Sequence, residues 1–214
     1  DSIKETNGRT VPDRNGLVWL TLSAVRRAEG AEGDDLISRL MRAEYEGQKL
    51  DDHQVTTFVR SLLPAAGETT TRTFSSVLTL LLERPELVER VRNDRSLIPK
   101  LIDEAVRFEP MATFKVRQTA KELELCGMTI PQGAMVQAVV ASANRDDDAF
   151  ENGDEFNIFR KPKPSFGFGF GPHMCIGQFI AKTELTVALN AVLDMFPNLR
   201  FDPSQPKPEI TGAQ

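Results

Sequence analysis

The sequence has few of the residues that build disulfide frameworks or metal clusters. It contains two cysteines, Cys126 and Cys175, and two histidines, His53 and His173. Two cysteines do not make a disulfide framework, so a reducing cytoplasm is the expected location. Two histidines exclude a histidine-rich metal site. Any metal would have to be held with very few ligands from the protein.

An excess of positive charge and long apolar runs are also missing. The 26 Lys and Arg residues are outnumbered by 31 Asp and Glu residues, for a net charge of −5, and the isoelectric point of about 5.2 argues against a nucleic-acid partner. No run of about 18 apolar residues occurs, so we expect no membrane span. The first residues are polar, without a signal-peptide core. A start at Asp1 instead of Met suggests a piece of a longer chain.

Hydrophobic periodicity predicts a mainly α-helical protein with a small β portion, an α+β fold. We expect a polar segment with a short helix in residues 1–33, and one main domain in residues 34–214. Short strands joined by turns are predicted between residues 114 and 140, where we expect Cys126 to be a packed, inert thiol. The predicted helices cover residues 17–29, 36–47, 52–82, 85–91, 96–109 and the stretch after Cys175.

The longest predicted helix is interrupted by the sequence Pro64-Ala-Ala-Gly-Glu-Thr-Thr-Thr71. Proline removes one helical hydrogen bond, and threonine hydroxyls can bond to carbonyls one turn earlier. Two interpretations remain open for this segment. It is either a kinked or widened turn that presents an acid, Glu68, beside an alcohol, Thr69, or a surface-exposed polar break without a function.

A glutamate and an arginine, Glu104 and Arg107, are three residues apart on another predicted helix and share one face. Such pairs are common on protein surfaces, where they contribute about 0–1 kcal/mol. By itself the pair therefore indicates no function.

The most unusual stretch is Ser165-Phe-Gly-Phe-Gly-Phe-Gly-Pro-His-Met-Cys-Ile-Gly177. Glycines at 167, 169 and 171 let the backbone adopt conformations that other residues avoid and approach a flat ligand closely. Cys175 follows them, at the point where a predicted helix begins. Backbone N–H groups and the positive end of the helix dipole favour a thiolate at such a position.

Three roles for Cys175 are open. As a metal ligand it would suit a macrocycle that brings its own four nitrogens, since zinc would need three more protein ligands, and His173 could bond a heme propionate. As a nucleophile it would need a nearby base, but His173 is too close in sequence and His53 is far away. As a buried structural cysteine it would not need the surrounding glycines and histidine.

The pattern Phe168-x-x-Gly171-x-His173-x-Cys175-x-Gly177 resembles the heme-binding loop of the cytochrome P450 heme-thiolate monooxygenases, in the form found in soluble bacterial members. The resemblance covers roughly residue 34 to the end, and it matches only the C-terminal part of the longer family members.

Other motifs resemble the family's in the same order along the chain. Ala65-Ala-Gly-Glu-Thr-Thr70 resembles the oxygen-activation turn of the long distal helix, and Asn144-Arg-Asp146 resembles a later loop. Glu104-x-x-Arg107 resembles the ion-pair motif. Arg160 stands where the family completes that network, and Arg117 stands where an arginine bonds a heme propionate.

The resemblance implies the C-terminal part of the cytochrome P450 fold, in which a long kinked distal helix and a proximal cysteine loop with its helix flank heme b (iron protoporphyrin IX). It implies Cys175 as the iron ligand, Thr69 and Glu68 as catalytic residues that hold dioxygen and relay protons, and Glu104, Arg107 and Arg160 as a structural network. The implied cofactor-binding residues are Ala66, Arg117, Phe168, Gly169, His173, Cys175 and Gly177.

The implied reaction inserts one oxygen atom from O2 into a small apolar organic substrate. A ferredoxin and its reductase would supply the electrons, and Lys182 is a candidate for docking that acidic partner. Two alternatives remain. One is a truncated heme-binding or interaction fragment without oxygenase activity, and the other is a peroxide-using relative, which does not need the Glu68–Thr69 pair.

Overall fold

The computed structural model describes residues 25, 27, 30 and 32–210. The predicted polar segment and short helix within residues 1–33 lie almost entirely outside these residues. The chain forms two compact units, residues 1–68 and residues 69–214, and each is described by itself. The predicted domain boundary after residue 33 stays a prediction.

The first unit contains helix α2 (Leu36–Arg42), a hairpin of strands β1 (Glu44–Tyr45) and β2 (Gln48–Lys49), and the first part of helix α3 (Asp52–Leu82). The predicted extension of the first of these helices to residue 47 is wrong, because Glu46 and Gly47, with φ angles of 50° and 76°, form the turn of the hairpin. Asp35 caps α2, because its carboxylate accepts a hydrogen bond from the Ser38 N–H at 3.1 Å. Met41 and Val55 form a small buried core.

Helix α3 is α-helical over all 31 of its residues, with Pro64 in its interior. The expected interruption is therefore wrong, since the helix continues through the proline and the following glycine, but the surface exposure expected by the second interpretation is confirmed for residues 64–69. A threonine hydroxyl does bond one turn back, from Thr73 Oγ1 to the Thr69 carbonyl at 2.8 Å. Before the segment Val55 and Val59 are buried, and after it Val77 and Leu81 are buried, so packing holds the helix at both ends despite the poor local propensity.

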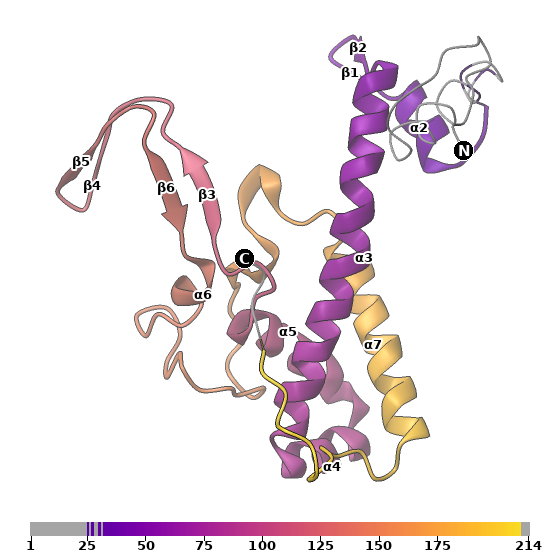
Figure 1. Cartoon of the computed structure of the whole chain (residues 1–214), viewed down its shortest axis with the longest axis vertical. Helices are drawn as coiled ribbons and strands as arrows, with labels where there is room; N and C mark the ends of the chain where they lie inside the picture. The colour runs from indigo at the N-terminus through magenta and orange to yellow at the C-terminus, as the bar shows by residue number, and fades with distance from the viewer. Residues whose placement is uncertain (1–24, 26, 28–29, 31, 211–214) are drawn as a thin grey trace. The chain divides into compact units, whose positions relative to one another are not determined.

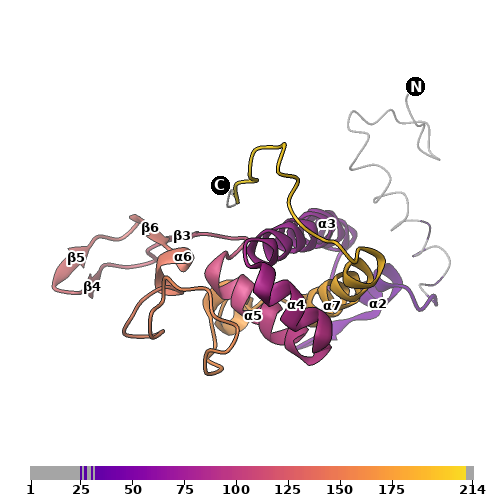
Figure 2. The ribbon, with the colours of Figure 1, turned by 90° about the horizontal axis from the view of Figure 1, so that it is seen from below.

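The core of the second unit is made by four helices that lie side by side in Figures 1 and 2. They are the C-terminal part of α3, α4 (Pro85–Asn93), α5 (Ile98–Phe108) and α7 (Gln178–Met195). A short 3₁₀ turn, η1 (Arg95–Leu97), connects α4 to α5. The side chains of Leu81, Leu101 and Leu189 are completely buried in this core, which fixes α5 against α7.

Two antiparallel pairs of strands form the β portion of this unit. Strand β3 (Lys115–Gln118) pairs with β6 (Met135–Ala138), and β4 (Leu123–Leu125) pairs with β5 (Met128–Ile130). Figure 1 shows the β4–β5 hairpin projecting beyond the β3–β6 pair. The short helix α6 (Val140–Ala143) follows. The predicted α+β fold class, mainly helical with a small β portion, is confirmed.

The packed position predicted for Cys126 is wrong. Cys126 and Gly127 have φ angles of 50° and 76° and connect β4 to β5 in a two-residue turn. This combination is typical of a tight hairpin turn, whose tip has no surface to pack against. The thiol of Cys126 is therefore exposed.

No helix in the described ranges combines the length and the apolar character needed to cross a lipid bilayer.

Candidate heme-binding site

The cysteine loop, residues 165–177, consists of two short 3₁₀ turns, η2 (Phe166–Phe168) and η3 (Gly171–His173), followed by the start of α7. Gly169 and Gly171 adopt φ angles of 81° and 70°, which residues with a Cβ rarely adopt. The Cys175 N–H donates a hydrogen bond to the Phe168 carbonyl at 2.8 Å. The glycine turns thus fold the loop back on itself and place Cys175 just before α7.

The Cys175 thiol is free and exposed, with exposed apolar neighbours. The side chains of Phe170 and Ile176 are 77% and 82% exposed. A Cβ added at Gly171 would meet nothing within 4 Å, and one at Gly177 would meet only the Cys175 Sγ, at 4.0 Å. The loop therefore offers a thiol in an open, apolar surface. The structural role considered for a buried Cys175 is wrong.

The donor set around Cys175 suits a ligand that brings most of its own metal coordination. Within the described residues, no group of three or more His, Cys, Asp or Glu side chains could hold a metal ion. A porphyrin supplies four nitrogens and needs one axial thiolate from the protein. The residues present therefore fit heme better than a zinc ion, which needs four ligands.

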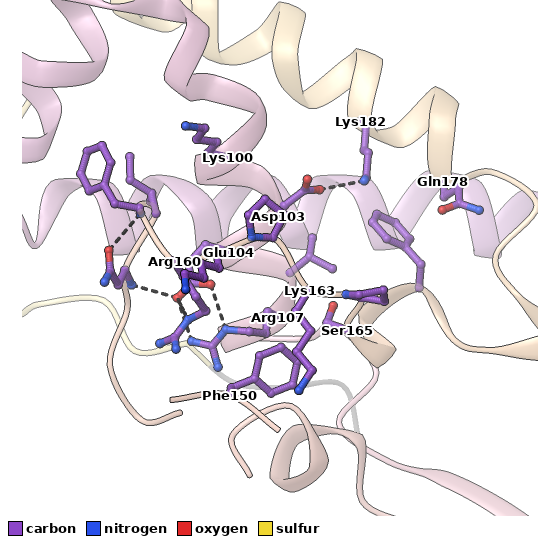
Figure 3. A pocket seen from close by; sticks show the side chains of 18 of the residues that line it. Lys100, Asp103, Glu104, Arg107, Phe150, Arg160, Lys163, Ser165, Gln178 and Lys182 are labelled. Atoms are coloured by element: carbon purple, nitrogen blue, oxygen red, sulfur yellow. Dashed lines mark hydrogen bonds and ion pairs between the residues drawn. The ribbon is translucent and has the colours of Figure 1, made fainter. Parts of the chain in front are cut away.

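Beside the loop, Glu104 and Arg107 form a buried ion pair on α5 (Figure 3). Arg107 donates from Nε to Glu104 Oε2 at 2.9 Å and from Nη2 to Oε1 at 2.8 Å. The Arg107 side chain is only 3% exposed and that of Glu104 only 6%, so the interpretation as an ordinary surface pair is wrong. Arg160 Nε lies 3.5 Å from Glu104 Oε1. The structure thus brings together the three residues of the predicted network.

The network also holds the chain segment that precedes the cysteine loop. Arg107 donates to the backbone carbonyls of Asn144, Gly153 and Glu155 at 2.7, 2.8 and 3.0 Å. Arg160 donates to the carbonyls of Asn152 and Glu155, both at 3.0 Å. Its Nε is buried near Glu104 without a hydrogen-bond partner in the described structure. Residues 144–155 are therefore anchored to α5 by guanidinium groups.

A cavity of about 640 Å³ lies between α5, residues 157–165, the cysteine loop and α7. Figure 3 shows Lys182 at this cavity with its ammonium directed at Asp103. The two charged atoms are 2.7 Å apart, and Lys182 Nζ lies 5.4 Å from the centre of the Phe168 ring. The charge of this predicted docking residue is therefore already paired within the chain.

The other predicted site residues are exposed. His173 ends the turn η3, and Arg117 on β3 donates to the Val116 carbonyl at 2.8 Å. Ala66, Glu68 and Thr69 lie on the exposed middle part of α3. The placement of these five residues around a bound heme stays a prediction.

Sequence reasoning missed Asn144, which links the Glu104–Arg107 network to the cysteine loop. Asn144 is completely buried, although its neighbours in sequence are three consecutive aspartates and other polar residues. Such a composition is typical of a solvated loop. The only signal for Asn144 was its place in the Asn144-Arg-Asp146 motif.

Comparison with known proteins places the chain in a family of related sequences. The sequence model of the family described as Cytochrome P450 matches residues 22–213. The chain is 38% identical over 197 residues to cyclomarin C epoxidase CymV from Salinispora arenicola, an alignment that covers 92% of this chain and 47% of that protein. It is 38% identical over 181 residues to erythromycin C-12 hydroxylase from Saccharopolyspora erythraea, covering 84% of this chain and 45% of that protein.

The same similarity extends to three-dimensional structure. The crystal structure of substrate-free CYP109E1 from Bacillus megaterium superimposes with a TM-score of 0.85 at 31% identity, covering 91% of this chain and 50% of that chain. CYP109E1 in complex with testosterone gives a TM-score of 0.84, also at 31% identity, with 91% of this chain and 53% of that chain covered. The chain spans about half the length of the relatives that it matches.

Proposed function

Because the chain belongs to the cytochrome P450 family, whose cofactor is heme b, we propose that the protein works as a heme-thiolate monooxygenase. The observation that carries this proposal is the free, exposed Cys175 thiol at the end of the glycine turns. In the proposed reaction, one oxygen atom from O2 enters an organic substrate.

Heme b, when bound, supplies the iron that activates oxygen, and electron donation from a cysteine thiolate favours O–O cleavage. Cys175 would be the protein's ligand to the iron. Arg117 and His173 would donate hydrogen bonds to the propionates, which are carboxylates. The remaining proposed contacts have small or flat side chains that suit a planar ring, namely Ala66, Phe168, Gly169 and Gly177.

Thr69 and Glu68 would handle dioxygen and protons. The Thr69 hydroxyl is a donor and an acceptor, so it can hold dioxygen by a hydrogen bond while passing on a proton. Glu68 precedes it on α3 and is exposed, so it can take protons from water. This acid–alcohol pair favours the oxygenase over a peroxide-using relative, which needs no such proton delivery.

For the substrate we propose a small apolar organic molecule. The names of two relatives refer to an epoxidase acting on cyclomarin C and a hydroxylase acting on erythromycin, and a similar structure contains testosterone. We further propose a ferredoxin with its reductase as the electron source. The two free cysteines are consistent with a reducing cytoplasm as the location.

The proposal is tested by replacing the thiol. The full chain is mixed with hemin, reduced and exposed to CO, and we expect the red-shifted Soret band of thiolate ligation. Cys175→Ala should abolish this band. Cys126→Ser, which removes the exposed thiol of the β4–β5 turn, is the matched control and should keep it. A chain that takes up no heme would support the alternative of a fragment without oxygenase activity.

The role of Thr69 is tested by the fate of the electrons. Thr69→Ala removes the hydroxyl, so reduced oxygen should be released as hydrogen peroxide in place of hydroxylated product. The measurement is the ratio of peroxide formed to electron donor consumed, with Thr73→Ala, one turn further along α3, as the control. Unchanged coupling in Thr69→Ala would refute this role.

A further inference from the structure

Asn144 joins three segments of the second unit through two hydrogen bonds. Its Oδ1 accepts from the Phe166 N–H at 2.8 Å, and its backbone carbonyl accepts from Arg107 Nη1 at 2.7 Å. The residue itself is 0% exposed. It therefore connects the buried ion network on α5 directly to the first residue of the turn η2.

The contact at Phe166 lies at the start of a short structural path to the thiol. The next residue, Gly167, is pressed against α5, since a Cβ there would lie 2.3 Å from Val106 Cγ1. The residue after it, Phe168, accepts the hydrogen bond of the Cys175 N–H. The three residues of η2 thus run from the Asn144 contact to the Cys175 contact without an intervening loop.

Asn144 would be a costly residue if its side chain only filled space in the core. Its Nδ2 is buried without a hydrogen-bond partner in the part of the chain that the structure describes. A buried donor left unsatisfied costs stability, and an apolar residue of similar shape would avoid that cost. What an apolar residue cannot do is accept the hydrogen bond of the Phe166 N–H.

We propose that Asn144 is a positioning residue that clamps the start of the cysteine loop to α5 and thereby keeps Cys175 placed for thiolate ligation of heme. Only the second part of the inference, the placing of Cys175 for heme ligation, rests on the proposed function. The clamp itself is a property of the chain without heme. Asn144 acts through the backbone of η2 and touches neither the heme site nor the thiol.

The clamp is tested in the full, heme-free chain by amide hydrogen exchange at Phe166. Asn144→Leu removes the acceptor at nearly constant volume, so exchange at the Phe166 amide should be at least about tenfold faster than in the wild type. Asn144→Asp keeps an oxygen acceptor for the Phe166 N–H and should retain the protection. Asn190→Leu makes the same substitution on α7, where the side chain bonds the Thr186 carbonyl, and should leave Phe166 unchanged.

The consequence for ligation is tested with hemin and CO. The Leu variant should convert most of the thiolate-type Soret band to the band of a complex without thiolate, while the Asp and Asn190→Leu variants keep the wild-type spectrum. Wild-type exchange and spectrum in the Leu variant would overturn the proposal, as would an Asp variant that is as defective as Leu. If the Leu variant does not fold, Asn144→Ala, which also removes the acceptor of the Phe166 N–H, decides by the same two measurements.

The two proposals can fail separately. A wild-type chain that binds no hemin overturns the proposed function, and the exchange measurement at Phe166 still decides whether Asn144 holds the loop.

Discussion

At the scale of single residues, Glu104 offsets the charges of Arg107 and Arg160 in a site that water hardly reaches. Glu104→Ala would leave the Arg107 guanidinium buried without its carboxylate. We expect the free energy of unfolding to fall by about 3–5 kcal/mol, because a buried charge without its partner is strongly destabilising. Urea denaturation of the full chain measures this loss.

A matched control is the ion pair between Arg95 and Asp194, at 2.8 Å, in which Asp194 is 70% exposed. Asp194→Ala should cost less than about 1 kcal/mol, because water already screens the exposed carboxylate. Equal losses in the two variants would show that burial does not strengthen the Glu104 network.

At the scale of structural elements, the cysteine loop packs closely against α5 because Gly167 has no side chain. A Cβ at this position would lie 2.3 Å from Val106 Cγ1 and 2.6 Å from the Val106 carbonyl oxygen. Gly167→Ala should therefore push η2 away from α5 and cost about 1–3 kcal/mol, the usual range for overpacking. The measurement is again urea denaturation.

Gly67, in the middle of α3, is the control for this substitution. A Cβ there would meet nothing within 4 Å. Gly67→Ala should raise the free energy of unfolding by about 0.5–1 kcal/mol, since glycine in a helix loses more backbone entropy than alanine. A stabilising effect of Gly167→Ala would contradict the close docking of the loop.

At the scale of the whole molecule, stability should depend on pH through Glu109, the residue that follows α5. Burial raises the pKa of this carboxyl above its usual value of 4.5, and Glu83 raises it further, whereas the charge and hydrogen bond of Arg145 lower it. Arg145 contacts Glu109 at 2.6 Å and also lies 3.4 Å from Asp154. A carboxyl with a raised pKa binds its proton more tightly in the folded chain than in the unfolded chain.

The free energy of unfolding should therefore decrease as the pH rises from 4.5 through the raised pKa of Glu109, because the unfolded chain loses its proton first. Glu109→Gln cannot lose a proton and should lack this part of the decrease. Urea denaturation of both proteins between about pH 4 and pH 7 tests the sign. A wild type that gains stability relative to the Gln variant over this range would contradict it.

Much of the architecture could be predicted because it depends on local patterns. The apolar spacing of α4, α5 and α7, the Asp35 cap and the glycine turns at 127 and 133 are determined by residues close together in sequence. The interruption at Pro64 was predicted wrongly, because the continuity of α3 depends on packing that local sequence does not show. A long helix can keep a proline and a glycine when packing on both sides of them holds the remaining turns.

In the candidate site, too, local patterns could be predicted and long-range contacts could not. The motif of the cysteine loop indicated the family and, through that resemblance, heme as the cofactor, because tight turns and a metal ligand leave a local pattern in the sequence. Only the tertiary structure decided that the Glu104–Arg107 pair is buried, that Lys182 is paired with Asp103, and that Asn144 holds the loop. Burial and long-range hydrogen bonds depend on which segments meet in space, and residues 107, 144 and 166 become neighbours only after the chain has folded.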